Sequence, residues 1–142
     1  MIVGPHAFLL DAEALSALSD SDRRMQAWAT VARRTGSTFH ASTITLAEVA
    51  DGRGRDAAVR RIVKAIRLVD VTEWIGFTAG RLRRAATDAR RKPRDLTVDA
   101  VVAATALTLP APVVVLTSDP DDLRLLLGGT PVRVEEIGPD RS

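Results

Sequence analysis

The stretch PVVVLTSDPDDL (residues 112–123) joins a run of apolar residues to a dense group of acids. Consecutive Val and Leu residues, without polar alternation, are typical of a strand that is buried on both faces of a parallel sheet. Asp119 directly follows the run and precedes Pro120, an order that favours the start of a helix. The stretch therefore predicts a strand leading straight into a helix, which is one unit of an α/β fold.

The same alternation of strand and helix continues on both sides of this stretch. We expect the other strands at residues 7–11, 37–42, 67–71 and 132–137. We expect helices at residues 12–19, 19–36, 45–52, 55–66, 72–91, 97–109 and 120–129, with a break at 92–94. Strands that alternate with helices predict a three-layer α/β/α fold with a mostly parallel central sheet.

Length and composition limit the class of protein. The 142 residues include 46% hydrophobic and 27% charged side chains, so we expect residues 1–142 to form a single globular domain. The absence of cysteine excludes disulfides and thiolate metal sites. The apolar run at residues 1–11 is too short for a signal peptide or a membrane span. We therefore expect a cytoplasmic protein that does not enter a membrane.

Charge is unevenly distributed along the chain, although the formal net charge is only +2. Residues 52–94 carry 13 basic and 4 acidic side chains, whereas residues 95–142 carry 3 basic and 8 acidic ones. This separation suggests a polyanionic partner and a separate acidic site. Most of the basic residues are arginines, whose planar guanidinium group binds phosphate well. Ordinary solvated helix faces would produce the same pattern, so charge alone does not decide the function.

Four carboxylates fall near junctions between strands and helices: Asp11, Glu48, Asp99 and Asp119. Because the carboxyl ends of parallel strands meet at one edge of the sheet, we expect these side chains to converge there. Carboxylates that converge repel one another unless a cation lies among them. Oxygen ligands without His or Cys favour Mg²⁺ or Mn²⁺. Such ions assist phosphodiester cleavage, which would link the acidic site to a polyanionic partner.

Each acid also has a purely structural explanation. Asp11 and Asp119 each stand at the end of a predicted strand, where the N-cap of the following helix is expected. Glu48 is expected in the first turn of its helix, where Thr45 and Glu48 would form a capping box. Asp99 would complement the dipole of a helix that Thr97 caps. Capping alone, however, does not require a carboxylate at every junction, because Ser, Thr and Asn cap equally well.

Four motifs, in this order and spacing, resemble those of the PIN-domain ribonucleases, especially the VapC-type toxins of toxin–antitoxin pairs. The motifs are LLDAEAL (9–15), TLAEVA (45–50), TVDAVVAATAL (97–107) and LTSDPDDL (116–123). The resemblance covers nearly the whole chain. It implies an endoribonuclease that depends on Mg²⁺ or Mn²⁺ and cleaves RNA. It also implies a homodimer that a small antitoxin protein inhibits.

The resemblance further implies which residues form the site. The catalytic acids would be Asp11, Glu48, Asp99 and Asp119. The metal ligands among them would be Asp11, Asp99 and Asp119.

Supporting roles would fall to three nearby residues, Thr117, Ser118 and Asp122, whereas Asp121 is expected in solvent. Glu13 departs from the family pattern, which often has Asn, Ser or Thr at that position, and we expect it to point to solvent.

Two other functions remain open on the sequence alone. A receiver-like phosphoacceptor domain also gathers acids at strand ends, but it needs a lysine near the last strands. Neither Lys64 nor Lys92 lies there. The chain could also be an inactive PIN-like module that binds RNA or protein without cleaving it.

The few aromatic and histidine side chains give no further functional signal. Trp28 and Trp74 lie on apolar helix faces and are expected in the core. His6 and His40 fall beside or within short strands, where a packed histidine is expected rather than a catalytic base. The chain has no Tyr and only 4% aromatic residues, so base stacking on an aromatic platform is not indicated.

Overall fold

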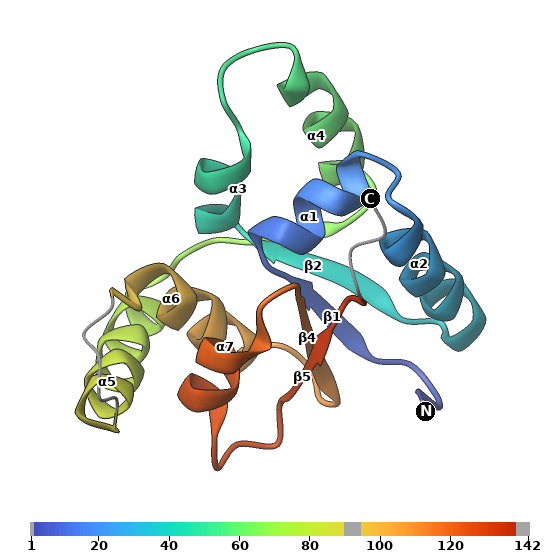
Figure 1. The fold of residues 1–142 in the computed structure, drawn as a ribbon. Coiled ribbons are helices and arrows are strands. Elements are labelled where there is room, and N and C mark those ends of the chain that lie inside the picture. Colours follow the sequence, from blue (N-terminus) through green and yellow to red (C-terminus); the bar gives the residue numbers. More distant parts are fainter. Residues whose placement is uncertain (1, 90–94, 139–142) are drawn as a thin grey trace.

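The computed structural model describes residues 2–89 and 95–138, so the break expected at 92–94 lies outside the described residues. Its central sheet is parallel throughout, in the order β3-β2-β1-β4-β5 (Figure 1). The strands are β1 (Ala7–Leu10), β2 (Thr38–Ser42), β3 (Arg67–Val69), β4 (Val113–Thr117) and β5 (Arg133–Glu136). The predicted parallel sheet is thus confirmed.

Helices cover both faces of the sheet and confirm the three-layer α/β/α class. They are α1 (Ala12–Ser19), α2 (Arg23–Thr35), α3 (Thr43–Val49), α4 (Arg55–Val63), α5 (Glu73–Ala89), α6 (Thr97–Ala106) and α7 (Pro120–Leu127). Side chains of α1, α2 and α4 pack on one face of the sheet, and those of α5, α6 and α7 pack on the other. Short α3 contributes buried Val49 and partly buried Leu46 to the core under α1, α2 and α4, and partly buried Ile44 to the other core.

The apolar run of the opening stretch forms the middle of the sheet, as predicted. Val113 and Val115 face the core under α5, α6 and α7, whereas Val114 and Leu116 face the core under α1, α2 and α4. All four side chains are buried. Because helices cover both faces of this strand, no side chain of it faces solvent, and this explains its continuous Val and Leu sequence.

The strand order places a crevice at one point of the sheet edge. β1 lies between β2 and β4, and the chain leaves these neighbours towards opposite sides of the sheet. In open α/β sheets, ligands bind at such a switch point, beyond the carboxyl ends of the strands. The order also differs from the 2-1-3-4-5 order of receiver-like domains, which argues against the phosphoacceptor hypothesis.

Two predictions about large side chains have different outcomes. Trp28 packs as expected: it meets Phe8 edge-on, and its Nε1 donates a hydrogen bond of 3.2 Å to the Ile137 carbonyl oxygen. The expected core position of Trp74 is wrong, because its side chain is 53% exposed. On α5 the core face is taken by other side chains, among them Ile75 and Ala79.

The described helices include none with both the length and the hydropathy that crossing a membrane requires.

Candidate active site

Asp11 and Thr117 lie side by side where β1 and β4 end. The strand register pairs Leu10 with Leu116, and the Asp11 backbone N–H donates to the Leu116 carbonyl oxygen over 3.2 Å. Asp11 is also the N-cap of α1, since its Oδ1 accepts a hydrogen bond of 2.9 Å from the Ala14 N–H. The cap leaves the second carboxylate oxygen, Oδ2, available for other contacts.

The surroundings of Asp11 oppose its negative charge. Burial raises the pKa of the Asp11 carboxyl, and the charges of Glu13 and Asp99 raise it further. Hydrogen bonds from Thr117 and from the Ala14 backbone partly offset this increase in pKa. The Thr117 hydroxyl also lies 3.3 Å from the Asp119 carbonyl oxygen. Having one proton to donate, it bonds more strongly to the charged carboxylate.

Glu48 occupies the last turn of α3, so its expected place in the first turn is wrong. The helix begins at Thr43, and Ser42 is its N-cap, accepting a hydrogen bond of 3.2 Å from the Ile44 N–H. The capping box of Thr45 and Glu48 therefore does not form. Ser42 lies three residues before the predicted helix start and ends the segment that was predicted as a strand, 37–42.

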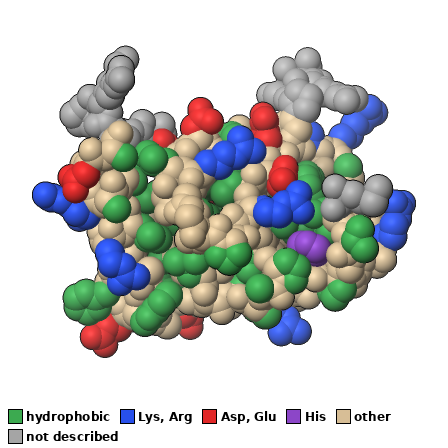
Figure 2. All heavy atoms as spheres, turned by 90° about the horizontal axis from the view of Figure 1, so that it is seen from below, with side chains coloured by type: hydrophobic (Ala, Val, Ile, Leu, Met, Phe, Trp, Pro, Cys, Tyr) green, Lys and Arg blue, Asp and Glu red, His purple; other side chains and the backbone are tan. Residues whose placement is uncertain are grey.

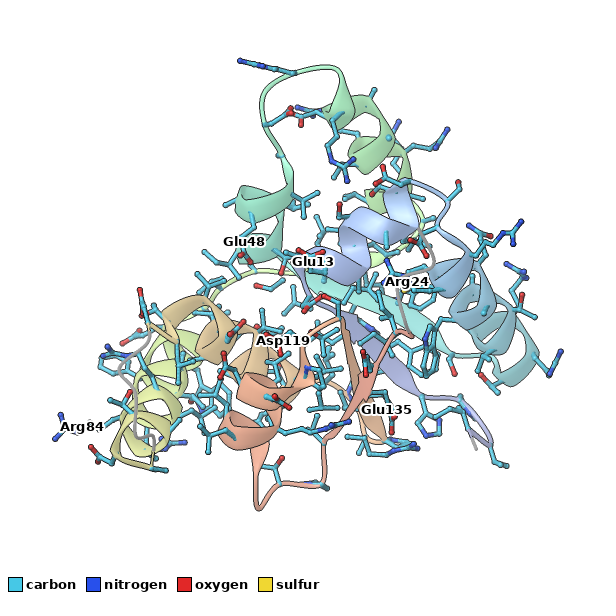
Figure 3. All side chains as sticks on the ribbon, viewed as in Figure 1. Glu13, Arg24, Glu48, Arg84, Asp119 and Glu135 are labelled. Carbon is cyan, nitrogen blue, oxygen red and sulfur yellow. The ribbon has the colours of Figure 1, made fainter. Side chains whose placement is uncertain are left out.

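Glu48 is surrounded by negative charge. Partial burial raises the pKa of its carboxyl, and the charges of Asp99, Asp11 and Glu13 each raise the pKa further. Figure 3 shows Glu13 on α1 and Glu48 on α3 above the sheet edge, with Asp119 at the start of α7 below them. We call Asp11, Glu13, Glu48 and Asp99 the acidic cluster. Glu13 is exposed, as expected, yet its charge acts on the site.

Asp99 is the third residue of α6 and is partly buried. The expected cap at Thr97 is wrong: the Thr97 hydroxyl and N–H both donate to Asp95, over 2.6 and 3.0 Å. Asp95 therefore binds the first N–H of α6, whereas the N-cap residue, Leu96, makes no side-chain capping hydrogen bond.

The fourth predicted acid, Asp119, shares the sheet edge with the cluster. It occupies the N-cap position of α7, but its side chain makes no capping hydrogen bond. Its backbone N–H donates instead to the Thr117 hydroxyl oxygen over 3.1 Å. The side chain is exposed. Asp119 reaches this edge of the sheet because it follows directly after β4.

The remaining predicted residues differ in burial. Thr117 is 1% exposed and Asp122 is 7% exposed, whereas Asp121 is exposed and Ser118 is partly buried. Burial distinguishes Asp122 from its exposed neighbour, as the sequence analysis expected.

Thr45 is a residue that sequence reasoning misinterpreted. Its side chain is fully buried, and within the described residues its Oγ1 has no hydrogen-bond partner. It lies three residues before Glu48, so the two side chains project from the same side of α3. A buried hydroxyl without a partner costs free energy of folding. The T-x-x-E spacing was the signal, but it indicated a shared helix face rather than a cap.

The donor set suits a hard divalent cation. All members of the acidic cluster offer carboxylate oxygens, and each charge that acts on Glu48 is negative. Asp11, Glu48, Asp99 and Asp119 are the residues that could hold such an ion. Among the described residues, no three His, Asp or Glu side chains are already arranged as ligands around one point. The acids are thus close enough to interact electrostatically, but the described side chains are not arranged as a complete set of metal ligands.

Comparisons with known proteins agree with this fold. The chain is similar to VapBC2 from Rickettsia felis bound to a promoter DNA fragment, with 13% identity, a TM-score of 0.70 and coverage of 92% of this chain and 98% of the matched one. It is similar to DNA-bound VapBC from Salmonella typhimurium, with 18% identity, a TM-score of 0.66 and coverages of 96% and 100%. It is also similar to VapBC-5 from Mycobacterium tuberculosis, with 21% identity, a TM-score of 0.60 and coverage of 92% of this chain and 98% of the matched one.

At these identities the structural similarity supports the fold alone, and a search of curated protein sequences gives no match. The model of one family, the PIN domain, matches residues 8–125. The matched segment runs from β1 into α7 and includes every residue of the acidic cluster together with Asp119. The chain therefore belongs to the PIN domain family.

Proposed function

We propose that the protein is a Mg²⁺- or Mn²⁺-dependent endoribonuclease that acts as the toxin of a toxin–antitoxin pair. One observation carries this proposal: Asp11, Glu48 and Asp99 come from three distant segments, and their charges act on one another at a single edge of the sheet. Such repulsion is a cost to the folded protein unless a cation offsets it. A nuclease site needs such converging carboxylates, because they bind the metal ion that assists phosphodiester cleavage.

The residues fit the metal, and each has a defined role in the proposal. Asp11, Asp99 and Asp119 would hold the ion at the ends of β1 and β4 and the start of α6. When bound, the ion supplies positive charge that stabilises the phosphate and makes a water molecule more acidic. Thr117 orients Asp11 by hydrogen bonding to its carboxylate. Glu48, whose raised pKa makes it a stronger base, is suited to accept a proton from the attacking water.

Basic side chains on α4 are suited to hold RNA by its phosphates. Arg60, Arg61 and Lys64 at this helix are exposed. Arg55 at its start is instead bound to the chain itself, through Ser16 and through an ion pair of 2.7 Å with Asp20. In Figure 1, α3 and α4 stand above the carboxyl ends of the strands, on the side where the acidic cluster lies. Phosphate contacts of this kind position a substrate without reading its sequence.

The toxin role has separate support. The matched structures are VapBC toxin–antitoxin complexes, so we propose a cognate antitoxin protein as the inhibitor, an RNA substrate, and action in the cytoplasm. The alternative of an inactive PIN-like binding module would keep the fold and lose the metal dependence.

The test is cleavage of a structured RNA by the purified protein with Mg²⁺ and with EDTA. We expect cleavage only with the metal, weakening as salt rises because phosphate contacts release counterions. Asp99→Asn should abolish cleavage. Asp95→Asn is the matched control, because Asp95 lies one turn earlier and the Asn side-chain oxygen can still accept the hydrogen bond from the Thr97 N–H.

Full activity of Asp99→Asn, or cleavage in EDTA equal to that in Mg²⁺, would contradict the proposed site. Cleavage of single-stranded DNA in preference to RNA would keep the nuclease and overturn its substrate. Metal binding without any cleavage would favour the inactive module.

A further inference from the structure

The hydroxyl group of Thr45 on α3 is buried without a hydrogen-bond partner. The residue is 0% exposed, and nothing among the described residues bonds to its Oγ1. Folded proteins bond nearly all of their buried hydroxyl groups, because an unpaired one costs free energy of folding. Thr105, which is equally buried, follows this rule by donating to the Val101 carbonyl oxygen over 2.7 Å. Thr45 is therefore an exception that calls for a physical reason.

The position of Thr45 on α3 directs its side chain towards the acidic cluster. Its chain neighbours, Ile44 and Leu46, pack into the two cores on opposite faces of the sheet. Successive residues of a helix are about 100° apart, so Thr45 lies midway between these two directions. On its two sides α3 packs against α6 and α1, and these helices carry Asp99 and Asp11 at their starts. The Thr45 side chain thus faces the junction at which these two acids interact.

The charges at this junction are of one sign. Every charge that acts on Glu48 is negative. On the face that Figure 2 shows, seen from the side away from α4, basic and acidic side chains are interspersed instead. A hydroxyl group has one proton to donate, and it bonds more strongly to a charged carboxylate than to a neutral oxygen. We therefore expect the Thr45 hydroxyl to donate to one of the acids.

Glu48 is the acid best placed to accept this proton. It follows Thr45 by three residues, and side chains at this spacing are neighbours on a helix surface. It also lies on the side of α3 that carries Ile44 and packs on α6, and Asp99 of α6 makes the largest of the charge contributions to its raised pKa. Among the described residues, no group donates a hydrogen bond to the Glu48 carboxylate. One face of α3 thus carries an unpaired donor and an unpaired acceptor.

Repulsion within the acidic cluster explains why Thr45 and Glu48 are not bonded to each other. The Glu48 side chain is exposed, so solvent stabilises its charge. Turning inward towards Thr45 would bring its carboxylate closer to Asp11 and Asp99, which is unfavourable while their charges are unopposed. A cation among the acids removes this penalty, so the Glu48 carboxylate can then turn inward and accept the hydrogen bond.

We propose that Thr45 is a positioning residue for Glu48, and that its hydroxyl donates a hydrogen bond to the Glu48 carboxylate once a divalent cation balances the acidic cluster. This inference rests on the proposed metal-dependent nuclease and adds a residue that contacts neither the metal nor the RNA. Because the hydrogen bond forms only together with cation binding, each strengthens the other. The hydrogen bond also holds the Glu48 carboxylate in one orientation, as its proposed role of accepting a proton from water requires.

The first test measures the Mn²⁺ dissociation constant of the full-length protein by isothermal titration calorimetry. Thr45→Val should raise this constant about fivefold to tenfold, because Val occupies similar space without a donor. Thr45→Ser keeps the hydroxyl and should stay within about twofold of the unmodified protein. Thr105→Val is the matched control: it removes a buried hydroxyl that is already bonded within α6, so the Mn²⁺ constant should not change. Circular dichroism checks that each variant folds.

The second test asks whether Thr45 acts through Glu48. In a protein that carries Glu48→Ala, the further change Thr45→Val should alter the Mn²⁺ constant by less than about twofold, because the acceptor is already gone. Single-turnover cleavage gives an independent readout. With Mn²⁺ saturating, Thr45→Val should lower the maximal rate about tenfold and leave the RNA concentration that gives half of this rate unchanged, because Glu48 is misplaced while RNA binding is intact.

The contrary outcomes separate this inference from the proposed function. An unmodified protein that binds no Mn²⁺ overturns the metal site and the role of Thr45 together. If the unmodified protein binds Mn²⁺ and cleaves RNA, and Thr45→Val binds Mn²⁺ equally well, only the role of Thr45 is wrong. Equal losses in Thr45→Val and Thr45→Ser would show a packing effect and contradict the hydrogen bond. A loss that persists in Glu48→Ala would contradict the assignment of Glu48 as the acceptor.

Discussion

The helices α1 and α2 each begin with an aspartate whose side chain makes a capping hydrogen bond, and the two aspartates have opposite electrostatic surroundings. Asp22 caps α2 by accepting a hydrogen bond of 2.8 Å from the Arg24 N–H, and its carboxylate pairs with the Arg24 guanidinium at 2.9 Å. These contacts lower the pKa of Asp22. Asp11 makes an equivalent cap at α1, yet burial and the nearby acids raise its pKa.

This is the difference that we expect between an acid that only caps a helix and an acid of the proposed metal site. A cap that exists for stability gains a basic neighbour, as Asp22 does. Asp11 has Glu13 and Asp99 as neighbours instead, and both make its charge less favourable. A fold retains such repulsion where another requirement outweighs stability. The predictions below test this contrast between the two caps.

The largest effect should be on activity. Asp11→Asn keeps a good N-cap but removes a proposed metal ligand, so Mg²⁺-dependent RNA cleavage should fall by about 100-fold or more. Asp22→Asn keeps the cap of α2 and touches no proposed ligand, so its cleavage rate should stay near that of the unmodified protein. The measurement is the single-turnover rate on the same RNA. Equal losses in the two variants would show that the caps do not differ in function.

Two buried threonines should respond in opposite directions to the same substitution. Thr45→Val removes a hydroxyl that has no partner and should raise the free energy of unfolding by about 1 kcal/mol in EDTA. Thr105→Val removes a hydroxyl that donates to the Val101 carbonyl oxygen over 2.7 Å and should lower it by about 1 kcal/mol. Urea unfolding measures both. Destabilisation by Thr45→Val would mean that the Thr45 hydroxyl is bonded in the folded protein.

Stability should depend on pH through the raised carboxyl pKa values. A carboxyl with a raised pKa binds more protons in the folded state, so its contribution favours folding at low pH. This contribution is lost as pH rises from about 4, the ordinary carboxyl value, through the raised pKa. In EDTA at pH 7, Asp11→Asn should therefore be more stable than the unmodified protein, and the difference should shrink towards pH 4. A difference that grows as pH falls would contradict the assigned direction.

The smallest effect should come from Glu13, an exposed member of the acidic cluster. The charge of Glu13 makes the smallest of the contributions that raise the pKa of Glu48. Glu13→Gln removes this charge, so the pKa of Glu48 should fall slightly. An NMR titration of the Glu48 side chain in the absence of metal measures it. A rise in the pKa of Glu48 would mean that Glu13 does not act through its charge.

Much of the fold was predictable because its local signals agree with its packing. The continuous apolar run of β4 and the alternation of strands with helices each have one physical interpretation, and the structure confirms both. The strand order was not predictable, because it depends on which crossover packs on which face. The acids could be assigned to one edge only through the general rule for parallel sheets.

The errors share a cause: one local pattern fits two structures. The Thr45 to Glu48 spacing fits a cap and also a shared helix face, and Thr97 fits a cap until Asp95 accepts its hydrogen bonds. Trp74 lies beside an apolar stripe in sequence, but a helix of 17 residues has more apolar side chains than its buried face can hold. In each case tertiary contacts determine which of the two structures forms, and these contacts cannot be read from the local sequence.

The pairing of β1 with β4 has a consequence for synthesis on the ribosome. Leu10 finds its partner Leu116 only after α1 to α6 have been made, so Asp11 lacks its neighbour Thr117 while most of the chain is still emerging. Contacts between such distant segments form late. A nascent chain would therefore lack a complete site beside the ribosomal and messenger RNA that surround it.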